Sequence, residues 1–194
     1  MAVKEKNRCS WCLKDDIYKT YHDEVWGVPV YDDRELFEFL NLEGAQAGLS
    51  WYSILVRIDG YKKAFKNWDI KAISKMKEKD VERLMKDTGI IRNKLKINAV
   101  ITNAQAYLEL KKEQSLSDFL WDYVDGQPII NKYKKPSDSP AQTELSTQIS
   151  KDLKKRGFKF VGPTIMYAYM QAVGMVDDHV VSCWKRKSNS KNKK

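Results

Sequence analysis

The sequence of 194 residues contains few of the side chains that most often bind metals or act as nucleophiles, with two histidines and three cysteines. Their positions are therefore informative. The sequence also lacks a glycine-rich phosphate-binding loop, a dinucleotide-binding fingerprint and a nucleophile elbow. These absences exclude P-loop nucleotidases, Rossmann dehydrogenases and α/β-hydrolases of the usual motif-bearing kinds. The chain shows no internal repeat, which excludes a solenoid or a propeller.

Long apolar segments are missing as well. The N-terminal residues MAVKEKNRCS include no apolar core of a signal peptide, so we expect no secretory signal and no disulfide bond. The longest uncharged run spans residues 161–176 and contains glycine, proline and glutamine. Because this run is shorter than a membrane-spanning helix requires, we expect a soluble, cytoplasmic protein that does not enter a membrane.

The composition is that of a folded protein with a basic tail. Hydrophobic residues make up 42% of the chain, with six Trp, ten Tyr and six Phe, and the length suits one compact domain or two small lobes with a common core. Six of the positive charges lie in residues 185–194, so the net charge of +9 falls by six to +3 without them. We expect one helical domain over 1–184 and a disordered tail over 185–194 that attracts phosphates non-specifically.

Hydrophobic periodicity predicts helices and almost nothing else. The first expected helix begins at Asp32 or Asp33. The later ones cover approximately 51–65, 69–76, 80–86 (capped by Asp80), 93–110, 115–124, 143–156 and 163–174. Residues 126–140 are polar and contain three prolines, which indicates a surface connection. No run of alternating strands is present, so the predicted fold class is all-α.

The stretch from Leu42 to Trp51 contains a carboxylate, Glu43, within a run of small residues. One interpretation is close helix packing at Gly and Ala, with an exposed glutamate and a tryptophan in the core. The other is a half-buried carboxylate beside a ring that stacks on a flat ligand, which describes a pocket for a nucleobase. The ten residues by themselves leave both interpretations open.

The histidines and cysteines suggest a metal site. His179 and Cys183 are four residues apart, on one face if the segment is helical, and Cys9 and His22 lie near the other end of the chain. Together they would form a tetrahedral Cys2His2 zinc site that joins the two ends. Cys12 competes with His22 because Cys9-x-x-Cys12 is also a zinc half-site. The alternative is buried thiols and two unrelated histidines.

A basic turn at 89–94 separates two expected helices and carries Arg92 and Lys94, with Lys96 close behind. Such a turn could present backbone N–H groups and a helix N-terminus to a phosphate. An ordinary helical hairpin with a solvated basic turn would have the same sequence. The residues do not decide between these two interpretations.

Taken together, these stretches resemble the 3-methyladenine DNA glycosylase I family of bacterial alkylation-repair enzymes. The resemblance spans residues 8–183, and its motifs occur in the family's order. They are Arg8–Trp11, Tyr18–Asp23, Glu24–Pro29, Leu42–Trp51, Gly89–Arg92, Lys154–Gly162, and Met170–Ala172 followed by His179–Val181 and Cys183.

The resemblance implies a helix-hairpin-helix glycosylase fold and a role for each matching residue. Glu43 corresponds to the carboxylate that recognises the base, and Trp51 to the ring that stacks on it; Tyr18, Tyr21 and Trp11 correspond to further pocket walls. One structural zinc ion would be held by Cys9, His22, His179 and Cys183, with Cys12 as a spare thiol. The residues expected to contact DNA are Gly89, Ile90, Ile91, Arg92 and Lys94 in the hairpin, with Gln46 and Leu49 beside the vacated base.

The implied activity is excision of 3-methyladenine from double-stranded alkylated DNA by a monomer, after base flipping and with water as the nucleophile. No lysine matches a Schiff-base position, so strand cleavage is not expected. Two other classes remain as alternatives. A non-catalytic DNA-binding module would tolerate loss of Glu43 and Trp51, and a zinc-dependent hydrolase would need an open metal position.

Overall fold

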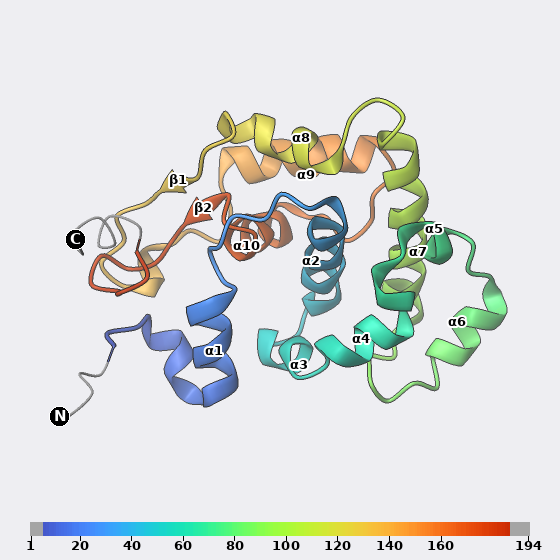
Figure 1. Ribbon diagram of the computed structural model, residues 1–194, viewed down its shortest axis with the longest axis horizontal. Helices are drawn as coiled ribbons and strands as arrows, with labels where there is room; N and C mark the ends of the chain where they lie inside the picture. The colour runs from blue at the N-terminus through green and yellow to red at the C-terminus, as the bar shows by residue number, and fades with distance from the viewer. Residues whose placement is uncertain (1–5, 187–194) are drawn as a thin grey trace.

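The computed structural model describes residues 6–186 and is mostly helical, as predicted (Figure 1). The predicted tail, 185–194, falls largely outside these residues. The longer helices are α1 (Asp16–Glu24), α2 (Asp33–Gln46), α4 (Ile58–Ala64), α6 (Glu78–Leu84), α7 (Lys94–Leu110), α9 (Glu144–Lys155) and α10 (Pro163–Ala172). The shorter ones are α3 (Trp51–Leu55), α5 (Ile70–Ser74) and α8 (Leu116–Trp121), with 3-10 turns η1 (Ser10–Lys14), η2 (Lys66–Trp68), η3 (Asp122–Val124) and η4 (Pro136–Asp138).

One small departure from an all-α fold is a parallel pair of two-residue strands, β1 (Ile129–Ile130) and β2 (Val176–Asp177). Ile129 pairs with Val176, and Ile130 pairs with Asp177. The pair is too short to give an alternating hydrophobic pattern, so periodicity could not predict it. Within residues 6–186 no helix is long and apolar enough to span a bilayer.

Helix α2 is the centre of the molecule and contacts α3, α7, α8 and α10 (Figure 1). The Asp32 carboxylate caps its start by accepting hydrogen bonds from the N–H groups of Arg34 and Glu35. Every residue from Phe39 to Ala45 is buried, polar ones included. A helix covered on all sides in this way has no solvent face, so any polar residue on it enters the protein interior.

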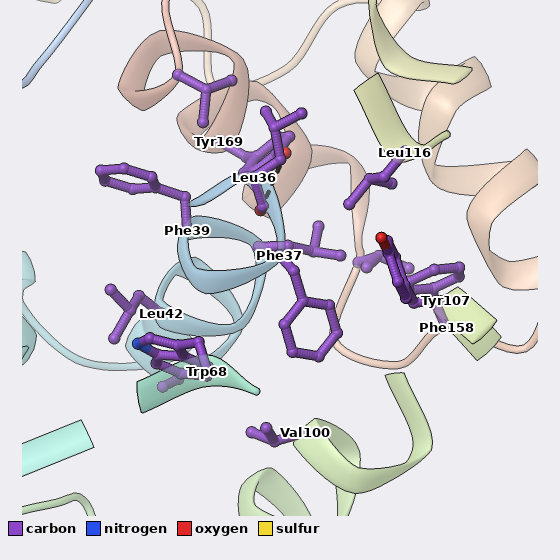
Figure 2. Packing of buried hydrophobic residues seen from close by; sticks show 14 of the residues in the cluster. Leu36, Phe37, Phe39, Leu42, Trp68, Val100, Tyr107, Leu116, Phe158 and Tyr169 are labelled. Carbon is purple, nitrogen blue, oxygen red and sulfur yellow. Dashed lines mark hydrogen bonds between the residues drawn. The ribbon is translucent and has the colours of Figure 1, made fainter. Parts of the chain in front are cut away.

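The core around α2 is made of large apolar side chains from distant segments (Figure 2). Phe37 packs edge-on against Trp68, with ring centroids 6.3 Å apart, and against Tyr107 at 5.9 Å. The Tyr169 hydroxyl of α10 donates a hydrogen bond to the Leu36 carbonyl at 3.2 Å. These contacts fix α2 against α7 and α10.

Several boundaries differ from prediction for local reasons. The expected helix over 51–65 is two helices, α3 and α4, with Val56 and Arg57 between them. Asp80 is not the N-cap of α6. It occupies the third helical position and accepts a hydrogen bond from the N–H of Lys77, the actual N-cap.

Two further predictions concern irregular segments. His179 and Cys183 lie in an irregular turn, so the helical condition for placing them on one face is not met. The polar segment 126–140 is a surface connection, as predicted, since none of its residues is buried, and Pro136, Ser139 and Pro140 also line a cavity. The cavity position depends on tertiary contacts, which a local pattern does not contain.

Candidate active site

A cavity of about 420 Å³ opens between α1, α2, α3 and α10. One side of it is built from five aromatic rings and an acidic residue: Trp11, Tyr18, Tyr21, Trp26, Trp51 and Glu43. We call this side the ring wall. It contains all five residues expected at a base pocket, together with Trp26, which was not expected there. The structure therefore brings η1, α1, α2 and α3 together at one place.

Glu43 lies in the last turns of α2 and is 4% exposed. Burial raises the pKa of its carboxyl group to about 8. No hydrogen bond joins this carboxyl group to any residue between 6 and 186. A buried carboxyl group without a protein partner, facing a cavity, is a group that a ligand can satisfy.

The rings around Glu43 are packed against one another rather than against solvent. Trp51 lies 5.3 Å from Tyr21, centroid to centroid, and Trp11 contacts Tyr18 and Tyr21 edge-on at 5.8 and 6.4 Å. The Trp51 Nε1 atom is buried without a hydrogen-bond partner in the described part of the chain. The wall thus offers π-faces and two unpaired polar groups to a flat ligand.

The opposite side of the cavity was not predicted. Its lining includes Pro136, Ser139, Pro140, Ala141, Thr164, Tyr167, Ala168, Gln171 and Asp178. We call it the polar wall. Its centre is Asp178, whose Oδ2 accepts hydrogen bonds from Tyr167 OH (2.7 Å), Gln171 Nε2 (2.8 Å) and Ser139 Oγ (3.0 Å).

The other carboxylate oxygen of Asp178 accepts a hydrogen bond from Asn131 Nδ2 at 2.6 Å. One buried carboxylate therefore holds the 131–141 connection against α10. This arrangement was not predictable from the sequence, since the connection carries no recognisable motif. The only signal was Gln171, which belongs to one of the family motifs.

The small residues of the Leu42–Trp51 stretch serve packing and turning, not the pocket. A Cβ atom on Gly44 would lie 3.0 Å from Phe160 Cβ, so glycine allows the 158–162 segment to approach α2. Gly48 adopts φ +75° in the turn that follows the helix. The packing interpretation is confirmed for Gly44, but its exposed glutamate is wrong, because Glu43 is buried and lines the cavity.

Near the cavity, three metal-binding side chains meet. The ligand atoms of Cys9, His22 and Cys183 all lie within 4.8 Å of one another, and all three residues are buried. His22 Nε2 is 3.4 Å from Cys183 Sγ. The hydrogen bond from Cys9 lowers the pKa of Cys183 and raises that of Cys9, so the two thiols share a proton.

His179, the fourth expected ligand, lies beside this cluster, with its ring centroid 5.0 Å from that of His22. Each histidine places Nδ1 at 2.8 Å from a carboxylate, His22 from Asp23 and His179 from Asp177. The Nε2 atom of His22 therefore faces Cys183 Sγ, and that of His179 is buried without a partner in the described chain. Carboxylates in these positions orient imidazole ligands in metal sites.

Cys12 is outside the cluster. Its thiol donates a hydrogen bond to the Cys9 carbonyl at 3.1 Å, and burial raises its pKa to about 11. A neutral, buried thiol is a poor metal ligand. Of the two alternatives left by the sequence, the structure places His22, not Cys12, in the cluster with Cys9 and Cys183.

The basic turn forms a hairpin between α6 and α7, braced by α4. A Cβ atom on Gly60 of α4 would lie 2.0 Å from the Gly89 carbonyl oxygen, so the two backbones are in direct contact. The Ile91 N–H donates a hydrogen bond to the Tyr61 hydroxyl at 3.3 Å, and Ile90 is buried. The hairpin is therefore rigidly placed, and Ile90 has only its backbone available to a partner.

Of the hairpin's charged residues, Arg92 is exposed and Lys94 pairs with Glu78 at 2.6 Å on the surface. Gln46 and Leu49, the two residues expected beside a vacated base, lie at the C-terminal end of α2 and in the turn after it. Gln46 lines the cavity, and Leu49 is 40% exposed in the turn that follows the helix. The structure thus places Gln46 in the cavity lining and Leu49 on the surface three residues further along the chain.

Comparisons with known proteins agree with this geometry. The chain matches the family model "Methyladenine glycosylase" over residues 11–186. It is 48% identical to DNA-3-methyladenine glycosylase 1 of Escherichia coli (strain K12) over 91% of this chain and 95% of that protein. It is 45% identical to DNA-3-methyladenine glycosylase of Haemophilus influenzae over 91% and 96%.

Solved structures of such proteins share the fold. A crystal structure of 3-methyladenine DNA glycosylase I superposes with a TM-score of 0.91 at 48% identity, covering 93% of this chain and all of that one. The Staphylococcus aureus enzyme superposes with a TM-score of 0.90 at 39% identity, covering 93% and 97%. With a family model that spans almost the whole described chain, the protein belongs to the methyladenine glycosylase family.

Proposed function

We propose that this protein hydrolyses the N-glycosidic bond of 3-methyladenine in alkylated double-stranded DNA after the damaged nucleotide has been flipped out. The observation that carries the proposal is Glu43, a buried carboxyl group without a protein partner among electron-rich rings. The names of its relatives support the substrate, and one related structure is that of a glycosylase variant in complex with 3-methyladenine.

The pocket must distinguish a cationic base from a neutral one. Adenine methylated at N3 is positively charged in DNA and leaves as a neutral base, so its glycosidic bond is already weak and little acid catalysis is required. Stacking a cation on the rings of Trp51 and Tyr21 contributes roughly 0.5–2 kcal/mol. The pocket therefore selects the damaged base by its positive charge.

Glu43 makes this selection sharper. Because burial raises its pKa to about 8, the carboxyl group is largely protonated in the empty cavity at neutral pH. A cationic base compensates the charge of the ionised carboxylate, which also accepts a hydrogen bond from the exocyclic amine. A neutral purine offers no such compensation, so it leaves Glu43 protonated and binds more weakly.

DNA would be held through the hairpin. The first N–H groups of α7 lack partners within the helix, and the Asn93 side chain accepts only that of Lys96. The N–H groups of Lys94 and Leu95 are thereby left for a phosphate, with the Arg92 guanidinium nearby. In this arrangement water attacks the sugar carbon, and no enzyme amine forms a covalent intermediate, so the activity is monofunctional.

We also propose that Cys9, His22, His179 and Cys183 hold one zinc ion. Two thiols and two imidazoles form the usual donor set of a closed structural zinc site. Cys9, His22 and Cys183 already lie together, and the buried, unpartnered Nε2 of the neighbouring His179 is the candidate for the fourth position. Bound zinc would cross-link the 9–22 segment, which includes most of α1, to the segment after β2. With four protein ligands it has no open position for substrate.

Base release from methylated duplex DNA tests the function, with the released bases separated by chromatography. The expected result is selective release of 3-methyladenine, with 7-methylguanine left in place and the strand intact. Release of both bases would keep the enzyme class and contradict the charge-selective pocket. No release by folded, zinc-loaded protein that still binds DNA would indicate a non-catalytic DNA-binding module.

A further inference from the structure

Lys96 makes two hydrogen bonds that the proposed function has not yet used. Its Nζ atom donates to the carbonyl oxygens of Ala45 at 2.8 Å and Ala47 at 2.6 Å. These carbonyls belong to the end of α2 and to its C-cap. Lys96 itself lies in the first turn of α7, where its N–H donates to the Asn93 side chain at 3.1 Å. One lysine thus joins the start of the hairpin's second helix to the end of the helix that carries Glu43.

The contact occurs where α2 needs a donor. The last carbonyl groups of a helix have no partner within it and carry a partial negative charge. An ammonium group between two of them satisfies the hydrogen bonds and the charge together. Burial lowers the pKa of Lys96, which shows that the group is partly removed from water. A partly buried lysine bonded to two carbonyls is a fixed structural element rather than a mobile surface charge.

The chain after these carbonyls has little else to hold it. Residues 47–50 form a turn in which Gly48 has a positive φ, and the Leu49 N–H donates to the Gln46 carbonyl at 2.7 Å. Gln46 lines the cavity immediately before this turn, and Leu49 projects from the turn with 40% of its surface exposed. Small changes at Ala45 and Ala47 would therefore move both side chains.

We propose that Lys96 is a positioning residue that couples the DNA-gripping hairpin to the 47–50 turn, so that Gln46 and Leu49 enter the gap left by the flipped nucleotide. The inference rests on the proposed function. It assigns Lys96 to the opening of the duplex, not to recognition of the base, which belongs to Glu43 and the rings. Binding of the hairpin to the DNA backbone and insertion at the gap become parts of one rigid unit.

The variant that tests this is Lys96→Met, which keeps an unbranched side chain one atom shorter and removes the ammonium group. We expect the single-turnover excision rate on fully paired duplex to fall about 10- to 100-fold, the range expected when a positioning group is displaced by about 1 Å. Free 3-methyladenine should bind within about twofold of wild type, because the wall of the base pocket does not involve Lys96. Lys96→Arg, which retains donors, should recover part of the rate.

A second substrate separates this role from general loss of structure. In a duplex whose damaged base faces an abasic site, extrusion costs less, so the defect of Lys96→Met should shrink to about threefold or less. Lys112→Met is the matched control, since Lys112 follows the same helix and bonds only to Glu109 on the surface. It removes the same charge and should leave both rates unchanged.

Equal losses on the two substrates, or no loss on either, would overturn the proposal. A double variant with Leu49→Ala gives an independent check. If Lys96 acts through the turn, the two changes together should cost little more than the larger of them, whereas full additivity would contradict the coupling. If Lys96→Met is unfolded at the assay temperature, Lys96→Gln replaces it. Failure of the wild-type protein to release any base would instead count against the proposed function.

Discussion

The two walls of the cavity differ in how their polar groups are satisfied. On the polar wall, the Asp178 carboxylate accepts hydrogen bonds from four side chains. On the ring wall, the Glu43 carboxyl group and Trp51 Nε1 have no partner in the described part of the chain. Both carboxyl groups are about equally buried, at 5% and 4% exposure.

This contrast separates structure from function. A buried carboxylate whose oxygens are occupied holds chain segments together and has no capacity left for a ligand. A buried carboxyl group without partners costs stability, and the cost is recovered when a ligand arrives. The degree of burial by itself does not distinguish Glu43 from Asp178. The predictions below test whether this difference holds.

The largest effect is expected for Glu43→Gln, which removes the charge and keeps the shape. Excision of 3-methyladenine should fall about 100-fold or more, as when a single group that stabilises charge is lost. Binding of the free base should weaken, and affinity for undamaged duplex should stay nearly unchanged. Glu38→Gln is the control, because Glu38 lies on the same helix but outside the cavity, 3.7 Å from Lys62. Equal loss of base and duplex binding would contradict the recognition role.

Asp178→Asn should act mainly on stability. An amide in place of the carboxylate turns one acceptor into a donor that faces other donors, at a cost of about 1–3 kcal/mol. Thermal denaturation should show a lower melting temperature, while the excision rate at a temperature well below it changes less than about tenfold. An excision loss as large as that of Glu43→Gln, in a protein of normal stability, would show that the polar wall also takes part in the chemistry.

Gly60→Ala tests whether the hairpin, unlike the two cavity walls, acts in binding the duplex. The new methyl group would meet the Gly89 carbonyl oxygen at 2.0 Å, so the hairpin must shift, with a stability loss of about 1–3 kcal/mol. Duplex affinity measured by fluorescence anisotropy should drop, and free-base binding should persist. Gly126→Ala is a useful comparison, because nothing lies near its Cβ position, and any stability loss there comes from its positive φ, which Gly60 does not have. Unchanged duplex affinity in Gly60→Ala would remove the hairpin from the DNA interface.

The smallest effect concerns pH. The pKa of Glu43 is raised to about 8 in the folded protein, so the folded state holds its proton longer than the unfolded chain does. Stability from this group is therefore complete below the unfolded pKa and declines as pH rises toward 8, by at most about 1.4 kcal/mol per pH unit. Chemical denaturation at pH 5.5 and 6.5 should show Glu43→Gln gaining stability relative to wild type as pH rises. A parallel pH dependence of the two proteins would mean that Glu43 is not buried in solution.

Much of the fold followed from the sequence by local rules. The starts of α2 and α7 were predictable because Asp32 and Asn93 cap them, and α8, α9 and α10 because Ser115, Thr143 and Pro163 open them. The break between α3 and α4 and the strand pair were not predictable. They depend on contacts between segments far apart in the chain, which a local pattern cannot record.

The candidate site divides in the same way. By itself the sequence determined which residue types were available: one carboxylate in an apolar stretch, a set of rings near the N-terminus, and two histidines and three cysteines. Only the tertiary structure decided that residues 39–45 of α2 are buried on every side, with no hydrogen-bond partner for Glu43 in the described part of the chain, and that the Asp178 carboxylate accepts four hydrogen bonds. It also placed His22, not Cys12, beside Cys183, and Lys96 across the end of α2. The physical reason is that the burial of a residue and its hydrogen bonds depend on the side chains packed around it. Those side chains come from segments far apart in the chain.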